Sequence, residues 1–337
     1  MIDVEQSRNL TRRAVLPAVV AVAATVGVIA TAPESSSGAQ GALGEGDQLR
    51  IMAPASPGGG WDQTSRAMQQ ALRDVVGRSE VYNVGGAGGT IGLSQFVRHE
   101  GDPSELMTFG LIMVGAVEAN RAPVGLDRVT PLARLTTDEE VVVVPANSPL
   151  RTVEDLAAAM RADLGAVSVA GGSAGGVEQI LAGLLAQSVG VDPSGVNYIA
   201  HSGGGEALTT VLSGRAAAAI SGVSEILAQI EAGTVRPLAV ASEERVPALR
   251  DVPTLRESGL DVVLSNWRGV AAPGGITPAQ EQALEELIGQ MVRTSTWQET
   301  LRDRGWGDAF LPGEPFRAFV DDEQRRVADV LAAIGLG

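Results

Sequence analysis

The chain has 337 residues, of which 45% are hydrophobic, and this is enough for two compact domains with buried cores. The absence of cysteine and lysine excludes disulfides, thiolate nucleophiles, cysteine-based zinc sites, lysine-dependent phosphate loops and Schiff-base chemistry. A formal net charge of −15 counts against nucleic acid or an anionic membrane surface as a partner.

The N-terminus has the layout of an export signal. Arginines precede an apolar run from Ala14 to Ala32, and Ala30-Thr31-Ala32 fits a signal-peptidase site. We therefore predict a signal peptide over 1–32, a polar linker over 33–46, and a mature chain outside the cytoplasmic membrane, periplasmic or at the cell surface. The export route stays open, because the pair Arg12-Arg13 is typical of the twin-arginine route. Cleavage also stays open, because an uncleaved apolar run would act as a membrane anchor.

Short apolar runs alternate with helical patterns along the rest of the chain. The runs predict strands at 49–53, 81–84, 106–114, 141–144, 167–170 and 238–240. Apolar residues at helical spacing predict helices at 63–76, 91–98, 152–161, 177–189 and 315–334. Thr152 and Asp155 form an approximate capping box at the start of the third helix.

This alternation predicts an α/β fold with mostly parallel sheets. The length favours two sheets over one, and hence two lobes with a ligand cleft between them. We place one lobe at residues 47–134 plus 254–337 and the other at 135–253.

Four glycine-rich turns each fall between a predicted strand and a predicted helix. They span Pro57–Asp62, Gly85–Thr90, Gly171–Gly176 and Ser202–Glu206. A helix start has free N–H groups and a partial positive charge, and glycine lets a ligand approach the backbone closely. Two such turns in each lobe would bind an anion from both sides without a cationic side chain. The alternative is that these turns are only tight connections.

Several motifs, in a fixed order, resemble the receptors of tripartite tricarboxylate transporters, the Bug-type extracytoplasmic solute receptors. They are Ala53–Gln63, Gly86–Gly92, Asn197–Ala207, Leu238–Val240, Arg245, Val252–Leu255 and Trp267–Val270, and the likeness covers roughly residues 48–335. Trp61-Asp62 and the string Ser202–Glu206 most resemble the citrate branch of that family. Tyr198–His201 departs from the Tyr-Lys-Gly that many relatives have near the central loop.

The resemblance implies a two-lobed periplasmic-binding-protein fold of type II and a receptor that captures a citrate-like di- or tricarboxylate. It also implies a two-component membrane permease as the partner. The implied ligand contacts are Gly58, Gly59, Gly60, Trp61, Asp62, Ala87, Gly88, Gly89, Thr90, Ser173, Ala174, Gly175, His201, Ser202, Gly203, Gly204 and Gly205, with Ser221 and Glu225 as further candidates. We expect no cofactor, no metal, since two scattered histidines form no ligand cluster, and a monomer.

Single residues have alternative structural roles. Asp62 is predicted to cap its own helix. Trp267 either walls the cleft or packs in a core, and His201 either donates to a carboxylate or is incidental. Arg268 is the arginine we expect to reach the ligand. The acidic run Asp138–Glu140 is interpreted as a solvated loop.

Two other functions are alternatives to a transport receptor. A receptor of this kind could present its ligand to a signalling membrane protein, which the sequence does not separate from transport. The run Gly171–Gly175 matches Gly-x-Ser-x-Gly, the nucleophile turn of α/β hydrolases. However, His201 is the only histidine downstream and leaves too little room for the usual order of serine, acid and histidine. We therefore predict that the chain is not an enzyme.

Overall fold

The computed structural model describes residues 48–201 and 204–336, all within one compact unit of the chain that spans 36–337. The predicted export signal and linker, 1–32 and 33–46, lie outside the described residues, as do Ser202, Gly203 and Gly337. Across the ranges described, none of the helices combines the length and apolarity that a bilayer crossing requires.

The first group of strands contains three parallel ones, β1 (Leu49–Ala53), β2 (Ser79–Asn83) and β3 (Glu105–Gly110). Antiparallel strands extend it, namely β9 (Ser265–Pro273) beside β3, and then β4 (Val129–Pro145) and β10 (Gly307–Pro312). Helices cover both faces of these strands, so β1 is buried on both sides. Ile51 belongs to one cluster of buried hydrophobic residues and Met52 to another.

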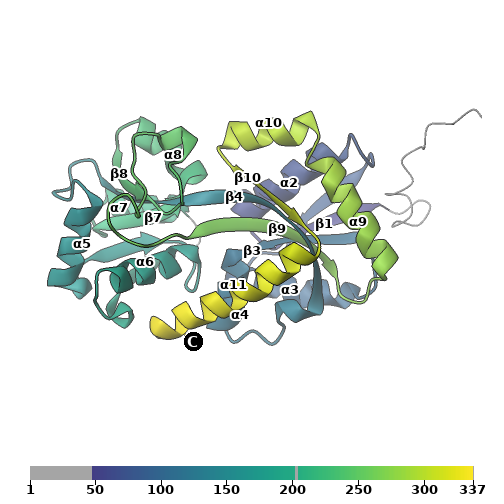
Figure 1. The fold of residues 1–337 in the computed structure, drawn as a ribbon, viewed down its shortest axis with the longest axis horizontal. Coiled ribbons are helices and arrows are strands. Elements are labelled where there is room, and N and C mark those ends of the chain that lie inside the picture. Colours follow the sequence, from purple (N-terminus) through teal and green to yellow (C-terminus); the bar gives the residue numbers. More distant parts are fainter. Residues whose placement is uncertain (1–47, 202–203, 337) are drawn as a thin grey trace, which may run out of the picture. The chain divides into compact units, whose positions relative to one another are not determined.

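The helices of this group form two layers. One layer contains α2 (Gly60–Leu72), α9 (Pro278–Met291) and α10 (Ser295–Arg304), and the other contains α3 (Thr90–Phe96), α4 (Leu111–Ala119) and α11 (Glu314–Ala333) (Figure 1). In α2 the apolar residues recur at helical spacing, so Ala67, Met68, Ala71 and Leu72 are buried together.

The second group of strands contains β5 (Ser168–Gly171), β6 (Asn197–Ala200) and β7 (Ala218–Gly222), which are parallel, and β8 (Val235–Val240). Its helices are α5 (Val153–Ala162), α6 (Val177–Ser188), α7 (Gly204–Leu212) and α8 (Val223–Glu231). The capping box predicted at Thr152 is present at the start of α5.

One strand, β4, belongs to both groups. Its residues from Val129 to Glu139 pair with β9, and its residues from Glu140 to Pro145 pair with β7 and β8. The strand order is β2-β1-β3-β9-β4-β7-β5-β6 (Figure 1). The predicted α/β fold with parallel strands in each half is therefore observed. The two predicted sheets, however, are joined through β4 into one sheet of ten strands, in which β4 and β9 pair antiparallel with their neighbours. The exact lobe boundaries, 47–134 plus 254–337 and 135–253, stay a prediction.

Two sequence interpretations were wrong. The strand predicted over 106–114 ends at Gly110, and α4 begins at Leu111. This stretch is buried almost throughout, so its apolar run has no periodicity that separates a strand from a buried helix. The acidic run Asp138–Glu140 is not a solvated loop but part of β4, with Asp138 and Glu140 buried.

Candidate functional site

A cavity of about 370 Å³ brings the four glycine-rich turns together. Of the predicted ligand residues, those that line it are Gly59, Gly60, Trp61, Ala87, Gly88, Gly89, Ser173, His201, Gly204 and Glu225. Its wall also contains Pro54, Ala55, Ser56, Gly86, Ile112, Glu140, Gly172, Glu178, Gly222, Asn266 and Arg268. The predicted residues placed outside the wall are Gly58, Asp62, Thr90, Ala174, Gly175, Gly205 and Ser221.

Asp62 shapes the first turn and does not face the cavity. The N-cap of α2 is Gly59, which corrects the prediction that Asp62 caps this helix. Asp62 lies three residues further on, and its carboxylate accepts from Gly58 N at 2.8 Å, Asn83 Nδ2 at 2.9 Å and Arg66 Nε at 3.0 Å. Burial alone would raise the pKa of Asp62, but these hydrogen bonds and the Arg66 charge hold it below its ordinary value.

Arg268, on β9, gives the cavity a positive charge beside the start of α2. Its side chain is buried, and Nη2 donates to Asp138 Oδ2 at 2.8 Å. Nη1 has no partner among the residues that the structure describes. A Cβ atom placed on Gly60 would lie 2.9 Å from Nη2, so the guanidinium lies against the first turn of α2. The N–H groups of Gly60 and Trp61 have no intrahelical acceptor at this position.

The second turn needs glycine for both its backbone and its packing. Gly86, Gly88 and Gly89 have positive φ, as has Ala87. A Cβ atom on Gly89 would come within 2.7 Å of the Trp61 ring. The second turn therefore packs directly on the first, and together they form one wall of the cavity.

The opposite wall is acidic. Glu140 from β4, Glu178 from α6 and Glu225 from α8 all line the cavity. Glu140 Oε1 accepts from Asn266 Nδ2 at 3.1 Å, whereas Oε2 of Glu140 and Oε2 of Glu178 have no partner in the described part of the chain. Burial raises the pKa of Glu140 well above its ordinary value, and the Glu178 charge adds to the rise. Burial also raises the pKa of Glu178, to about 7.

Protein carboxyl groups already lie at three of the four turns. Asp62 accepts a hydrogen bond from Gly58 at the first turn, Glu178 lies against Gly172 at the third, and Glu225 lies against Gly204 at the fourth. The binding of one anion by all four turns therefore stays a prediction. The cavity has hydrogen-bond donors at Gly60, Trp61 and Arg268, and acidic side chains at Glu140, Glu178 and Glu225.

His201 is held at the end of β6, where its N–H donates to Gly171 O at 3.1 Å. Its Nδ1 lies 3.9 Å from Glu206 Oε2, and its Nε2 is buried without a hydrogen-bond partner among the described residues. Ser173 lines the same cavity, but within those residues no hydrogen bond links it to His201 Nε2. The contact between nucleophile and base that a hydrolase requires is thus not formed there.

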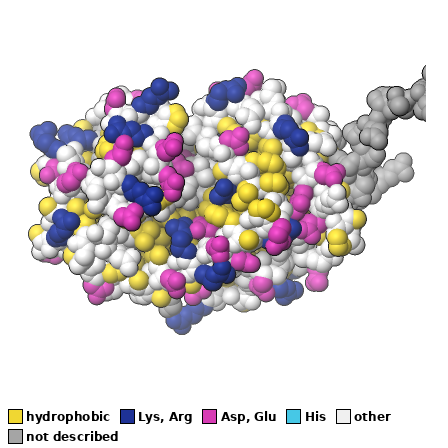
Figure 2. All heavy atoms as spheres, in the orientation of Figure 1, with side chains coloured by type: hydrophobic (Ala, Val, Ile, Leu, Met, Phe, Trp, Pro, Cys, Tyr) yellow, Lys and Arg dark blue, Asp and Glu magenta, His cyan; other side chains and the backbone are white. Residues whose placement is uncertain are grey.

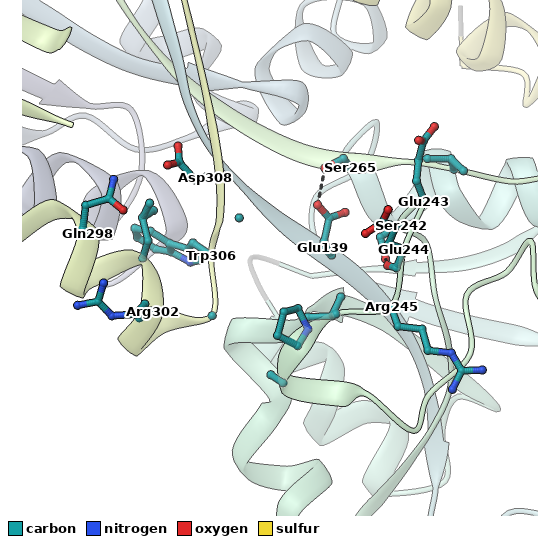
Figure 3. Close-up of a pocket in the computed structure, with 17 residues that line it drawn as sticks. Glu139, Ser242, Glu243, Glu244, Arg245, Ser265, Gln298, Arg302, Trp306 and Asp308 are labelled. Carbon is teal, nitrogen blue, oxygen red and sulfur yellow. Dashed lines mark hydrogen bonds between the residues drawn. The ribbon is translucent and has the colours of Figure 1, made fainter. Parts of the chain in front are cut away.

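A second, larger cavity of about 680 Å³ lies on the other face of β4 and β9. Successive residues of a strand point to opposite faces, so Glu139 and Ser265 line this cavity while Glu140 and Asn266 line the first. Figure 3 shows Trp306 on one side of it, Glu243 and Glu244 on the other, and the hydrogen bond of 2.8 Å from Ser265 to Glu139. The surface is hollowed between these two sides on the face drawn in Figure 2. None of the predicted ligand residues that the structure describes lines this cavity.

Trp267 and His99 lie outside both cavities. Trp267 is in the core, where Nε1 donates to Glu323 Oε2 at 2.9 Å. His99 forms a group with Asp102 and Glu105 outside both cavities, but Arg50 and Tyr82 already bind Glu105. We propose no metal site there.

The sequence profile described as "Tripartite tricarboxylate transporter family receptor" matches residues 64–336. The chain belongs to this family.

Similar proteins support this assignment. The receptor is 27% identical to Protein BugT of Bordetella pertussis over 293 residues, which is 85% of this chain and 89% of that protein. A TctC solute-binding protein from Polaromonas, solved without ligand, is 25% identical with a TM-score of 0.69, over 85% of this chain and 98% of that one. MatC from Rhodopseudomonas palustris, solved with bound malate, shares the fold at 24% identity and a TM-score of 0.71, over 84% and 98% of the two chains.

The family resemblance and the two-lobed fold predicted from the motifs are confirmed. Receptors of the tripartite tricarboxylate transporter family are periplasmic solute-binding proteins that work with a membrane permease. In this receptor, sequence reasoning found the glycine turns and Arg268 but missed Glu140 and Glu178. A signal for Glu178 existed, because an acid in the first turn of a helix after a glycine-rich turn commonly binds the free N–H groups itself.

Proposed function

We propose that this receptor captures a small carboxylate in the 370 Å³ cavity and delivers it, chemically unchanged, to a two-component permease of the tripartite type. The observation on which this depends is Arg268, a buried arginine whose Nη1 lacks a partner among the described residues, beside the free N–H groups at the start of α2. A carboxylate supplies two acceptor oxygens for such a set of donors.

The energetics suit a transport receptor. A hydrogen bond to a charged group contributes about 1.5–3 kcal/mol. Three of them, from Arg268, Gly60 and Trp61, would contribute about 5–9 kcal/mol before ordering costs, against about 8 kcal/mol for micromolar affinity. Backbone donors and one arginine are therefore sufficient for a ligand that must later be released.

Export is part of the same proposal. A receptor for a permease has to act outside the cytoplasmic membrane, and residues 1–32 have the layout of a signal peptide, with the twin-arginine pair Arg12-Arg13. We expect the secreted protein to begin near Pro33. Peptide mapping of the periplasmic fraction checks this, and an intact Met1 end on cytoplasmic protein would count against export.

Removing the Arg268–Asp138 pair tests the carboxylate site. Replacing Arg268 alone would leave the buried Asp138 carboxylate without its positively charged partner, so the double variant D138N/R268Q is the better choice. We expect it to weaken carboxylate binding by about tenfold or more, because one charge-assisted bond is lost. The control R256Q removes an exposed arginine outside the cavity and should bind like the unaltered protein.

Calorimetry against succinate, glutarate, citrate, aspartate, glutamate, a neutral amide and a sugar provides the measurement. Thermal unfolding confirms that each variant is folded. The citrate-like di- or tricarboxylate predicted from the sequence is one candidate within this panel. Preference for the amide or the sugar, or unchanged carboxylate binding by D138N/R268Q, would refute the proposed site. A receptor that presents its ligand to a signalling membrane protein would use the same cavity. Identifying the membrane partner distinguishes this role from transport.

A further inference from the structure

The carboxylate contacts proposed above leave the acidic wall of the cavity unused. Glu140 and Glu178 expose 0% and 8% of their surface, and the Oε2 atom of each has no partner in the described part of the chain. Buried polar atoms in native proteins nearly always have a hydrogen-bond partner. Both side chains line the cavity, so a bound ligand can reach these two oxygen atoms.

The neighbours of these carboxyl groups are hydrogen-bond donors. Asn266 Nδ2 donates to Glu140 Oε1 at 3.1 Å, and Gly172 and Gly204 lie against the carboxyl groups of Glu178 and Glu225. Burial raises the pKa of both Glu140 and Glu178, and a positively charged ligand group beside them would favour their ionised form.

Acidic groups outnumber positive charges at this wall. Among the described residues that line the cavity, Arg268 is the one arginine, and it pairs with Asp138 at 2.8 Å. Its charge acts to lower the pKa of Glu225, but burial and the Asp138 charge still leave that pKa above its ordinary value. A second carboxylate on the ligand would add a further negative charge to this wall and would be repelled by it.

An ammonium group fits the acidic wall better than any acceptor. It has a positive charge and three N–H donors, one for each of the three glutamates, and pairing would remove the cost of burying their charges. The opposite wall, at Arg268 and the start of α2, still accepts the ligand's carboxylate. The two walls thus match the two ends of a zwitterion.

We propose that the ligand has a primary ammonium group as well as a carboxylate, and that Glu140, Glu178 and Glu225 bind the ammonium. The ligand class is then a small amino carboxylate rather than a plain di- or tricarboxylate. This inference rests on the proposed function, because it assigns the other end of the same ligand.

Matched pairs of ligands test this inference. Calorimetry compares aspartate with succinate, glutamate with glutarate, and 4-aminobutyrate with butyrate, with citrate as an added competitor. We expect the amino member of a pair to bind at least about tenfold more tightly, the effect of one charge-assisted contact. Tighter binding of succinate, glutarate or citrate would overturn the inference and leave the proposed function intact. Failure of every carboxylate against the amide and sugar controls would overturn both.

Variants of the acidic wall provide a second readout. E140Q and E178Q keep the size of the side chain and remove its charge. Each should weaken binding of the amino ligand by about tenfold, and the matched ligand without the amino group should bind as tightly as before or more tightly. E139Q is the matched control, because Glu139 is the neighbour of Glu140 on the same strand but faces the other cavity. Equal losses for both members of a pair would indicate a purely structural role for the glutamates and contradict the inference.

Discussion

Three consecutive acidic residues of β4 have three different environments. Asp138 pairs with Arg268. Glu140 accepts a hydrogen bond from Asn266 in the 370 Å³ cavity, and Glu139 accepts one from Ser265 in the 680 Å³ cavity. The alternation of a strand produces this separation. A sequence alone does not show it, because a run of acids has the composition of a solvated loop.

Glu178 should make the stability of the receptor depend on pH. Burial raises its pKa from 4.5 to about 7, with the Glu225 charge adding to the rise. Between these two values the folded protein keeps a proton that the unfolded chain has released. The free energy of unfolding should therefore fall as the pH rises through this window.

Urea unfolding at pH 5 and at pH 7.5 measures this effect. Between those pH values the unaltered protein should lose roughly 1–3 kcal/mol more of its free energy of unfolding than E178Q, which has no titrating group there. An identical pH dependence in the two proteins would mean that Glu178 has its ordinary pKa in the folded state.

For helices and strands, patterns within a short stretch of sequence predicted the element, whereas features that depend on residues far apart in the sequence could not be predicted. The capping box of α5 and the amphipathic pattern of α2 place those helices within a few residues of their observed bounds. The length of β4, 17 residues, could not be predicted, because its polar centre is buried only through pairing with β7, β8 and β9. Those partners lie far away in the sequence.

The candidate site shows the same division. The glycine turns were visible because glycine between a strand and a helix is a local pattern. That Glu225 reaches Gly204 was not visible, because the two residues are on different helices, α8 and α7. Sequence reasoning therefore found the glycine turns that line the cavity and missed Glu140 and Glu178 beside them.

The turn before α3 should not tolerate a side chain at Gly89. This residue has a φ of 90°, and a Cβ atom would come within 2.7 Å of the Trp61 ring. We expect G89V to lower the free energy of unfolding by about 2 kcal/mol or more and to weaken ligand binding, since Trp61 lines the cavity. Urea unfolding and calorimetry measure the two effects.

G205A is the matched control for this substitution. Gly205 lies in α7, and apart from its chain neighbours and its own helix backbone, no described residue has an atom within 4 Å of the position that a Cβ atom would take there. Alanine at this position should therefore be neutral or stabilise the helix by up to about 1 kcal/mol. Equal stability of G89V and G205A would contradict the packing of the second turn on the first.

At the scale of the whole binding unit, β4 runs through both groups of strands, with β9 beside it along the first (Figure 1). The two walls of the ligand cavity come from opposite halves, and a ligand that bonds to both should draw them together by a hinge movement. Small-angle scattering should show a smaller radius of gyration with ligand bound. D138N/R268Q should show no such change at the same ligand concentration. A constant radius for the unaltered protein at saturation would indicate a rigid cleft.

Arg268 lines one cavity and Trp306 lines the other, yet the guanidinium carbon lies 5.1 Å from the centre of the Trp306 ring. A ligand that engages the guanidinium changes the field at the indole, so ligand binding should shift the fluorescence of Trp306. W306F should lose this part of the signal, whereas W297F, which alters a tryptophan of the core, should keep it. Identical titration curves for all three proteins would exclude the coupling. If it holds, occupancy of the receptor can be followed optically through a side chain on the far side of the strands, without a label and without touching the ligand.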